Sequence, residues 1–157
     1  QQADRAALRQ ALADGTIDAL VSDHSPVDED SKALPFAQAE PGATGLELLL
    51  SLALKWAKDS AIPLPQALAT ITSGPARILG SAVATPAGRL GTLGTLGTLA
   101  PGAVADICVF DPLAYWTVTP AALQSQGKHT PFGGYELPGV VRATLVDGVV
   151  SYHFSSV

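Results

Sequence analysis

The chain has 157 residues, of which 47% are hydrophobic and 15% charged, the balance of a globular rather than a disordered protein. Its net charge is −5 and its lysines and arginines form no cluster, which argues against the basic surface that nucleic-acid binding requires. No apolar run reaches the ~20 residues that span a bilayer, the first residues do not resemble a signal peptide, and a single cysteine excludes an internal disulfide. We therefore expect a cytoplasmic protein that binds neither membrane nor nucleic acid.

A helix followed by a short strand is expected at the start of the chain. Ala3–Ala13 is rich in Ala, Leu and Arg and ends at Asp14-Gly15, which predicts a helix with a glycine stop. The apolar run Ile17–Val21 predicts a buried strand that leads directly into Ser22-Asp23-His24-Ser25-Pro26. In barrels of alternating strands and helices the loops at this end carry the chemistry, so Asp23 is a catalytic candidate. An Asp before Ser-x-Pro can also simply cap a turn, and the pentapeptide alone favours the turn.

The next segment predicts a loop and then a series of helices. The stretch from Asp28 to Gln38 is polar, and its acidic start is expected to be a solvated loop. Thr44 and Glu47 have the spacing of a capping box, which predicts a buried apolar helix over Leu46–Trp56. Two shorter helices are expected after it, over Leu64–Ile71 and from Ser73 to Gly80.

Beyond Gly80 the pattern changes to strands separated by glycine and proline, with a compositional boundary over residues 81–88. Val104–Phe110 predicts a strand, in which we expect Cys108 to be a buried, unreactive thiol. Asp147-Gly148 predicts the tight turn of a hairpin, whose strands are expected over Val140–Val146 and Val149–His153. The tripeptide Gly-Thr-Leu occurs three times over Gly91–Leu99, which we interpret as an extended surface connection or a strand with an added turn.

Two motifs stand in the first third of the chain: Asp23-His24-Ser25-Pro26, after the predicted strand, and Gly45-Leu46-Glu47, at the end of a glycine-rich turn. Both resemble motifs of the dihydroorotases, within the amidohydrolase superfamily. The resemblance continues through residues 73–80, 97–102, 105–106 and 130–132. It implies an α/β chain in which residues 1–80 are the C-terminal part of a TIM-barrel amidohydrolase, its last strand and helices. Residues 81–157 would be part of a small flanking β-sandwich.

The resemblance also implies a chemistry. Amidohydrolases hold one or two divalent metals, usually zinc, which lower the pKa of a bound water. By resemblance Asp23 would contact the metal and its hydroxide, accept the proton during attack on the ring amide, and pass it to the leaving nitrogen. The implied reaction interconverts carbamoyl-aspartate and dihydroorotate in pyrimidine biosynthesis. Ala43 and Gly45 lie in the glycine-rich turn, whose backbone N–H groups would approach this small cyclic amide substrate.

The other ligands of the family, a His-x-His pair, often a carboxylated lysine and two further histidines, have no counterpart in this chain. Since successive strand residues point to opposite faces, His24 is expected to point away from Asp23 and to serve as a structural hydrogen-bonding residue. His129 and His153 are expected at the surface. Val27 stands where active dihydroorotases commonly have a second histidine, and valine cannot donate a hydrogen bond to the substrate carboxylate.

Three hypotheses follow from these residues. The first is a metal-dependent dihydroorotase, a homo-oligomer, of which this chain is the C-terminal part and which is inactive as an isolated fragment. The second is a non-catalytic dihydroorotase-like subunit that supports aspartate carbamoyltransferase, with Asp28-Glu29-Asp30 facing a basic partner surface; Val27 favours it. The third is a related cyclic amidase, such as a hydantoinase or an allantoinase, which would share Asp23 and differ in its substrate loops.

Overall fold

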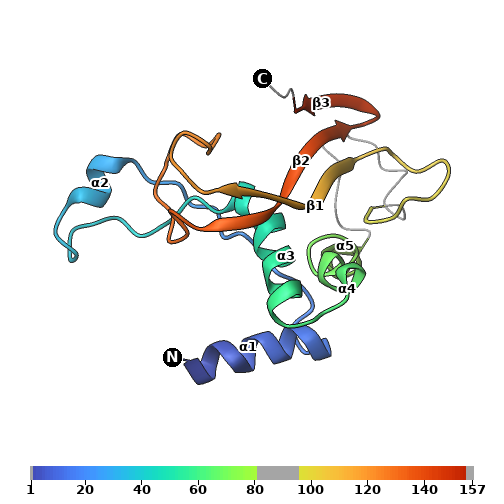
Figure 1. The fold of residues 1–157 in the computed structure, drawn as a ribbon, viewed down its shortest axis with the longest axis horizontal. Helices are drawn as coiled ribbons and strands as arrows, with labels where there is room; N and C mark the ends of the chain where they lie inside the picture. The colour runs from blue at the N-terminus through green and yellow to red at the C-terminus, as the bar shows by residue number, and fades with distance from the viewer. Residues whose placement is uncertain (1, 81–95, 155–157) are drawn as a thin grey trace.

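The computed structural model describes residues 2–80 and 96–154, in which helices come first and an antiparallel sheet follows (Figure 1). The helices are α1 (Gln2–Asp14), α2 (Glu29–Ala33), the 3-10 helix η1 (Leu46–Leu48), α3 (Leu49–Asp59), α4 (Leu64–Ala69) and α5 (Ser73–Leu79). The strands are β1 (Ile107–Thr117), β2 (Glu136–Val146) and β3 (Val149–His153), in the order β1-β2-β3. The predicted boundary over 81–88 and the first part of the Gly-Thr-Leu repeat lie outside the described residues.

The first helix is confirmed and ends where expected. Gly15 has a φ of +82°, a conformation that glycine adopts without the steric cost a side chain would add. The side chain of Gln66 in α4 donates a hydrogen bond of 2.7 Å to the carbonyl of Ala13. The end of α1 is thereby attached to the helices that follow.

The strand predicted over Ile17–Val21 is wrong. The segment has no ladder partner among the described strands; the Leu20 N–H donates to the carbonyl of Thr70 at 2.9 Å, and the Ile17 N–H donates to Ala11. A strand exists only through backbone pairing with a neighbour, so an apolar run alone does not make one. The segment instead delivers the chain from α1 to the motif at Asp23.

The predicted loop from Asp28 to Gln38 contains the short helix α2. The Asp28 carboxylate caps it by accepting hydrogen bonds from the Ser31 amide at 2.8 Å and the Ser31 hydroxyl at 2.9 Å, and these bonds lower the pKa of Asp28. Glu29 and Asp30 occupy its first turn, where the helix dipole favours negative charge. The acidic start therefore begins a helix, which lies at the end of an arm away from α3 and the sheet (Figure 1).

The long apolar helix begins three residues later than expected, after η1, and extends to Asp59. The predicted capping box is wrong, because neither side chain bonds to the helix terminus. The Thr44 hydroxyl donates to the carbonyl of Gly127, and the Glu47 carboxylate accepts from the loop that follows β1. Both residues therefore connect the segment that leads into α3 to a distant part of the chain.

The hairpin is confirmed. Asp147 and Gly148 have φ of +49° and +78°, the two positive values that a tight turn of this type requires.

The neighbouring strand β1 begins three residues after the predicted Val104 and runs on to Thr117. Cys108, expected to be buried, is exposed on β1; partial burial of its sulfur nevertheless raises the pKa of the thiol, so it stays protonated at neutral pH.

Two apolar clusters hold the helices and the sheet together. One lies where the start of α3 meets the sheet, and its buried members are Leu48, Val118, Leu123 and Leu137. The other joins α1, α3 and α4 and is built from Trp56, Ala57 and Ala67, with Leu12, Ala13 and Ile62 packed against it. Since α3 contributes to both clusters, it is the element on which the other parts pack.

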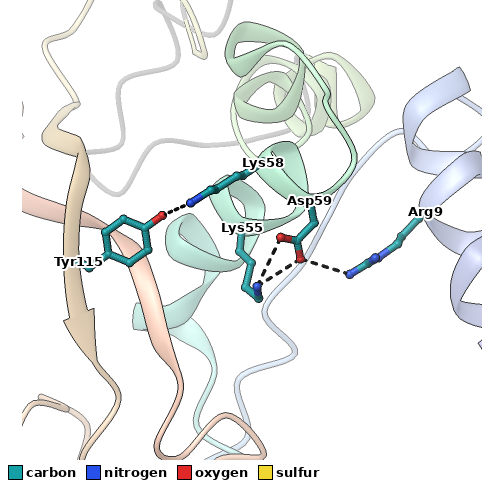
Figure 2. A network of polar contacts seen from close by, with 5 residues as sticks. All are labelled: Arg9, Lys55, Lys58, Asp59 and Tyr115. Carbon is teal, nitrogen blue, oxygen red and sulfur yellow. Dashed lines mark hydrogen bonds and ion pairs between the residues drawn. The ribbon is translucent and has the colours of Figure 1, made fainter.

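Polar contacts at the surface of α3 connect it to both sides (Figure 2). Asp59 forms ion pairs with Arg9 of α1 at 3.7 Å and with Lys55 at 3.2 Å. Lys58 donates to the Tyr115 hydroxyl of β1 at 2.7 Å, a contact that raises the pKa of Lys58. These exposed pairs orient the surface of α3 and add little to stability.

Candidate functional site

Three loop segments meet at the start of α3, and together we call them the loop cluster: residues 22–27, 42–47 and 124–129. The Ser25 N–H donates to the carbonyl of Ala43 at 3.1 Å, which joins the first segment to the second. The Thr44 N–H donates to the carbonyl of His129 at 2.8 Å, which joins the second to the third. Thr44 is almost completely buried between them.

Glycine is required where these segments touch. A Cβ added to Gly42, whose φ is +126°, would overlap the carbonyl oxygen of Ser25. A Cβ on Gly45 would lie 2.5 Å from the carbonyl oxygen of Ser22, and one on Gly127 would lie 2.9 Å from that of Val27. The missing side chains thus allow the three backbones to lie in direct contact.

Asp23 is the exposed carboxylate of the loop cluster. It adopts a φ of +45°, a left-handed conformation that Asp tolerates better than most residues but that still has to be held by its surroundings. The described residues contain no group of three or more His, Cys, Asp or Glu side chains that could hold a metal ion. The Asp23 side chain is exposed to solvent, and its assigned catalytic and metal-binding roles stay predictions.

His24 is the hydrogen-bonding residue that the sequence predicts. Its half-buried imidazole accepts hydrogen bonds at Nδ1 from the backbone N–H groups of Gly45 and Leu46, both at 3.2 Å. The Gly45 amide is therefore already engaged, and the Ala43 carbonyl is engaged with Ser25. Substrate contacts by Ala43 and Gly45 stay predictions.

Glu47 has a structural role in the loop cluster that the sequence analysis missed. Its carboxylate accepts from the N–H groups of Gln124 at 2.7 Å and Ser125 at 3.0 Å. Burial by itself raises the pKa of Glu47, but these two amides, the Ser125 hydroxyl and the Lys128 ammonium together lower it by more, so its pKa lies below the ordinary value. The Gly-Leu-Glu motif marked this residue, yet its distant partners left no local signal.

Val27 packs inside the loop cluster rather than at its surface. It is buried, and after the Ser25 carbonyl oxygen its methyl carbon is the next atom that a Cβ on Gly42 would meet, at 2.9 Å. Val27 therefore contributes an apolar contact between residues 22–27 and residues 42–47 of the loop cluster.

His129 and His153 are exposed, as the sequence predicts.

The fold and the loop cluster identify the class of protein. It is an α/β protein in which Asp23 and a glycine-rich turn lie together at the start of the buried helix α3. The chain belongs to the Amidohydrolase family, whose pattern it matches over residues 2–152. Among curated relatives, a dihydroorotase-like protein of Pseudomonas aeruginosa is 42% identical over 96% of this chain, and a dihydroorotase of Syntrophotalea carbinolica is 39% identical over 97%. The chain spans 32% and 33% of these relatives, about a third of their length.

Solved structures agree with this assignment. A D-hydantoinase structure superposes with a TM-score of 0.78 at 26% identity, covering 96% of this chain and 31% of the other. An L-hydantoinase (dihydropyrimidinase) from Arthrobacter aurescens gives a TM-score of 0.75 at 28% identity, covering 96% of this chain and 32% of the other.

Across residues 2–80 and 96–154, no helix has the length and apolar character needed to cross a membrane.

Proposed function

We propose that this chain forms part of a dihydroorotase-type cyclic amide hydrolase, to which it contributes Asp23. The reaction would close carbamoyl-aspartate to dihydroorotate and reverse that closure. The observation that carries the proposal is the exposed Asp23 carboxylate, presented in a left-handed turn beside a glycine-rich turn, in a chain of the Amidohydrolase family. Exposure matters here because a catalytic carboxylate must reach the substrate.

The role of Asp23 would be proton transfer. An ionised carboxylate can accept a proton from the attacking water and return it to the leaving nitrogen, a role that contributes ~10²–10⁴-fold to rate. Zinc, when bound, would supply hydroxide near neutral pH, with Asp23 as one ligand and the others from residues beyond the described ones. The loop cluster would keep Asp23 next to the turn at Ala43 and Gly45, where the substrate would lie.

The proposal extends to the fold of the full-length protein. Residues 1–80 would complete a TIM barrel, in which Ile17–Val21, without a ladder partner among the described strands, would pair with strands from the rest of the protein. Residues 81–157 would form part of a flanking β-sandwich. The sheet supports this extension, because β3 is an edge strand whose residues are all exposed, among them Val149, Val150 and Tyr152. Apolar side chains on an open edge are expected to be covered by further strands. We propose a cytoplasmic homo-oligomer for the full-length protein.

The test is turnover of dihydroorotate by the full-length protein, with hydantoin and allantoin assayed beside it. Asp23→Asn should lower kcat by at least about 100-fold, since the amide cannot accept the proton. Asp30→Asn is the matched control, because Asp30 is an exposed carboxylate on α2, which lies at the end of an arm away from α3 (Figure 1), and its substitution should leave kcat unchanged. Full activity in Asp23→Asn would refute the assigned role, and turnover of hydantoin or allantoin alone would identify a different cyclic amidase.

A second candidate is a non-catalytic subunit that supports aspartate carbamoyltransferase. It is favoured by Val27, whose buried apolar side chain cannot bind a substrate carboxylate, and by relatives named dihydroorotase-like. Metal analysis of the full-length protein by inductively coupled plasma mass spectrometry separates the two. At least one zinc per chain supports the hydrolase. No metal after zinc is offered, together with co-elution with the carbamoyltransferase, supports the subunit.

A further inference from the structure

His24 joins the two segments on which the proposed function depends. It follows Asp23 directly in the chain, and its Nδ1 accepts from the amides of Gly45 and Leu46. These amides stand at the beginning of η1, where backbone N–H groups have no partner within the helix. The imidazole thereby caps the helix from a different segment of the chain.

The geometry is that of one acceptor shared by two donors. Nδ1 of a neutral imidazole carries one lone pair in the ring plane, which the two donors share, and both bonds, at 3.2 Å, lie at the long end of the normal ~2.7–3.2 Å range. Accepting at Nδ1 also places the ring proton on Nε2. Each bond is of ordinary strength, but together they hold two successive residues of the turn.

The positive φ of Asp23 is the reason that the hydrogen bonds of the neighbouring His24 matter for the placement of the Asp23 carboxylate. A left-handed non-glycine residue persists only where neighbouring contacts hold it. Among residues 2–80 and 96–154, the hydrogen bonds on its C-terminal side include the two bonds of His24 and the bond from the Ser25 N–H to Ala43. Loss of the His24 imidazole would remove two of these three bonds and would let the turn at Gly45 and Leu46 move relative to the carboxylate.

We propose that His24 is a positioning residue that holds the Gly45-Leu46 turn against the loop carrying Asp23, so that carboxylate and substrate turn keep one relative placement. Its consequence for catalysis rests on the proposed function, whereas the hydrogen-bonded connection itself can be tested without activity. Because His24 would act on both the reacting carboxylate and the substrate turn, its loss should raise KM and lower kcat together.

The test uses two substitutions in the full-length protein. His24→Leu removes the acceptor at similar size, and His24→Asn restores an acceptor oxygen close to the position of Nδ1. His153→Asn is the control, because His153 is an exposed histidine on β3, remote in sequence from the loop cluster. The measurements are residue-resolved hydrogen exchange at Gly45 and Leu46, and kcat and KM for dihydroorotate.

We expect His24→Leu to accelerate exchange of both amides at least tenfold and to lower kcat/KM by about 30-fold, the effect of two ordinary hydrogen bonds. His24→Asn should recover most of both losses. A residue that only stabilises the fold would reduce the fraction of active enzyme and leave KM unchanged, so an unchanged KM in His24→Leu would overturn the proposal. Unchanged exchange would overturn it as well.

The two proposals fail in different ways. Full activity in Asp23→Asn, or a wild-type protein without hydrolase activity, refutes the proposed function. If exchange at Gly45 and Leu46 still accelerates in His24→Leu, the connection made by His24 stands as a structural device of the loop cluster. Slow exchange in His24→Leu refutes the connection whatever the activity is.

Discussion

Replacing Glu47 with glutamine should destabilise the chain, although the change removes only a charge. The carboxylate accepts two backbone N–H groups, from Gln124 and Ser125, and hydrogen bonds to a charged acceptor contribute about 1.5–3 kcal/mol each when buried. Glutamine keeps one acceptor oxygen and places its NH₂ group against the second donor. Since Glu47 is only half-buried, solvent recovers part of the loss, and we expect the free energy of unfolding to fall by about 1–2 kcal/mol.

The assay is urea unfolding followed by the fluorescence of the two tryptophans, one of which, Trp116, packs on the cluster that contains Leu48. Glu29→Gln is the matched control: Glu29 is exposed in the first turn of α2, where loss of the charge should cost at most about 0.5 kcal/mol. A Glu47→Gln protein as stable as Glu29→Gln would refute the reasoning, because the two amides would then be equally well satisfied without the charge.

The difference in unfolding free energy between the wild type and Glu47→Gln should depend on pH. The pKa of Glu47 is lowered in the folded state relative to its ordinary value of about 4.5, so its stabilising effect is complete above that value. It is lost as the pH falls through the lower folded pKa. The stability difference between wild type and Glu47→Gln should therefore shrink on acidification below about pH 4.5. A difference that stays constant to acid pH would contradict the assigned cause.

Two further substitutions test the packing around the site. Gly42→Ala should destabilise by at least about 2 kcal/mol, because its Cβ would overlap the Ser25 carbonyl and its φ is positive. Gly102→Ala has a positive φ but open space around it, so equal losses in the two variants would show that overlap is unimportant. Ser51→Ala should cost about 1–2 kcal/mol, because the Ser51 hydroxyl accepts from Trp116 Nε1 at 3.0 Å and its loss leaves that donor unpaired. A double-mutant cycle with Trp116→Phe should show coupling, and purely additive losses would contradict it.

Local signals in the sequence determined several elements. The first helix and its glycine stop, the apolar helix in the middle and the Asp147-Gly148 hairpin follow from patterns that span only a few residues. The Asp23-His24-Ser25-Pro26 motif indicated the family, and the family match over residues 2–152 agrees with it. The structural role of His24 was also expected, although its partners were not.

Only the tertiary structure decided what the polar side chains contact. Thr44 and Glu47 have the spacing of a capping box, yet Thr44 bonds Gly127, 83 positions away, and Glu47 bonds the amides of Gln124 and Ser125. The same holds for Ile17–Val21, whose apolar run meets no strand partner among the described residues. The spacing of a capping box and a run of apolar residues indicate which local structure a segment can form. The hydrogen bonds that a side chain makes depend instead on which donors and acceptors the folded chain brings beside it. The loop cluster is built from such distant partners, and for that reason its motifs could be read from the sequence but its geometry could not.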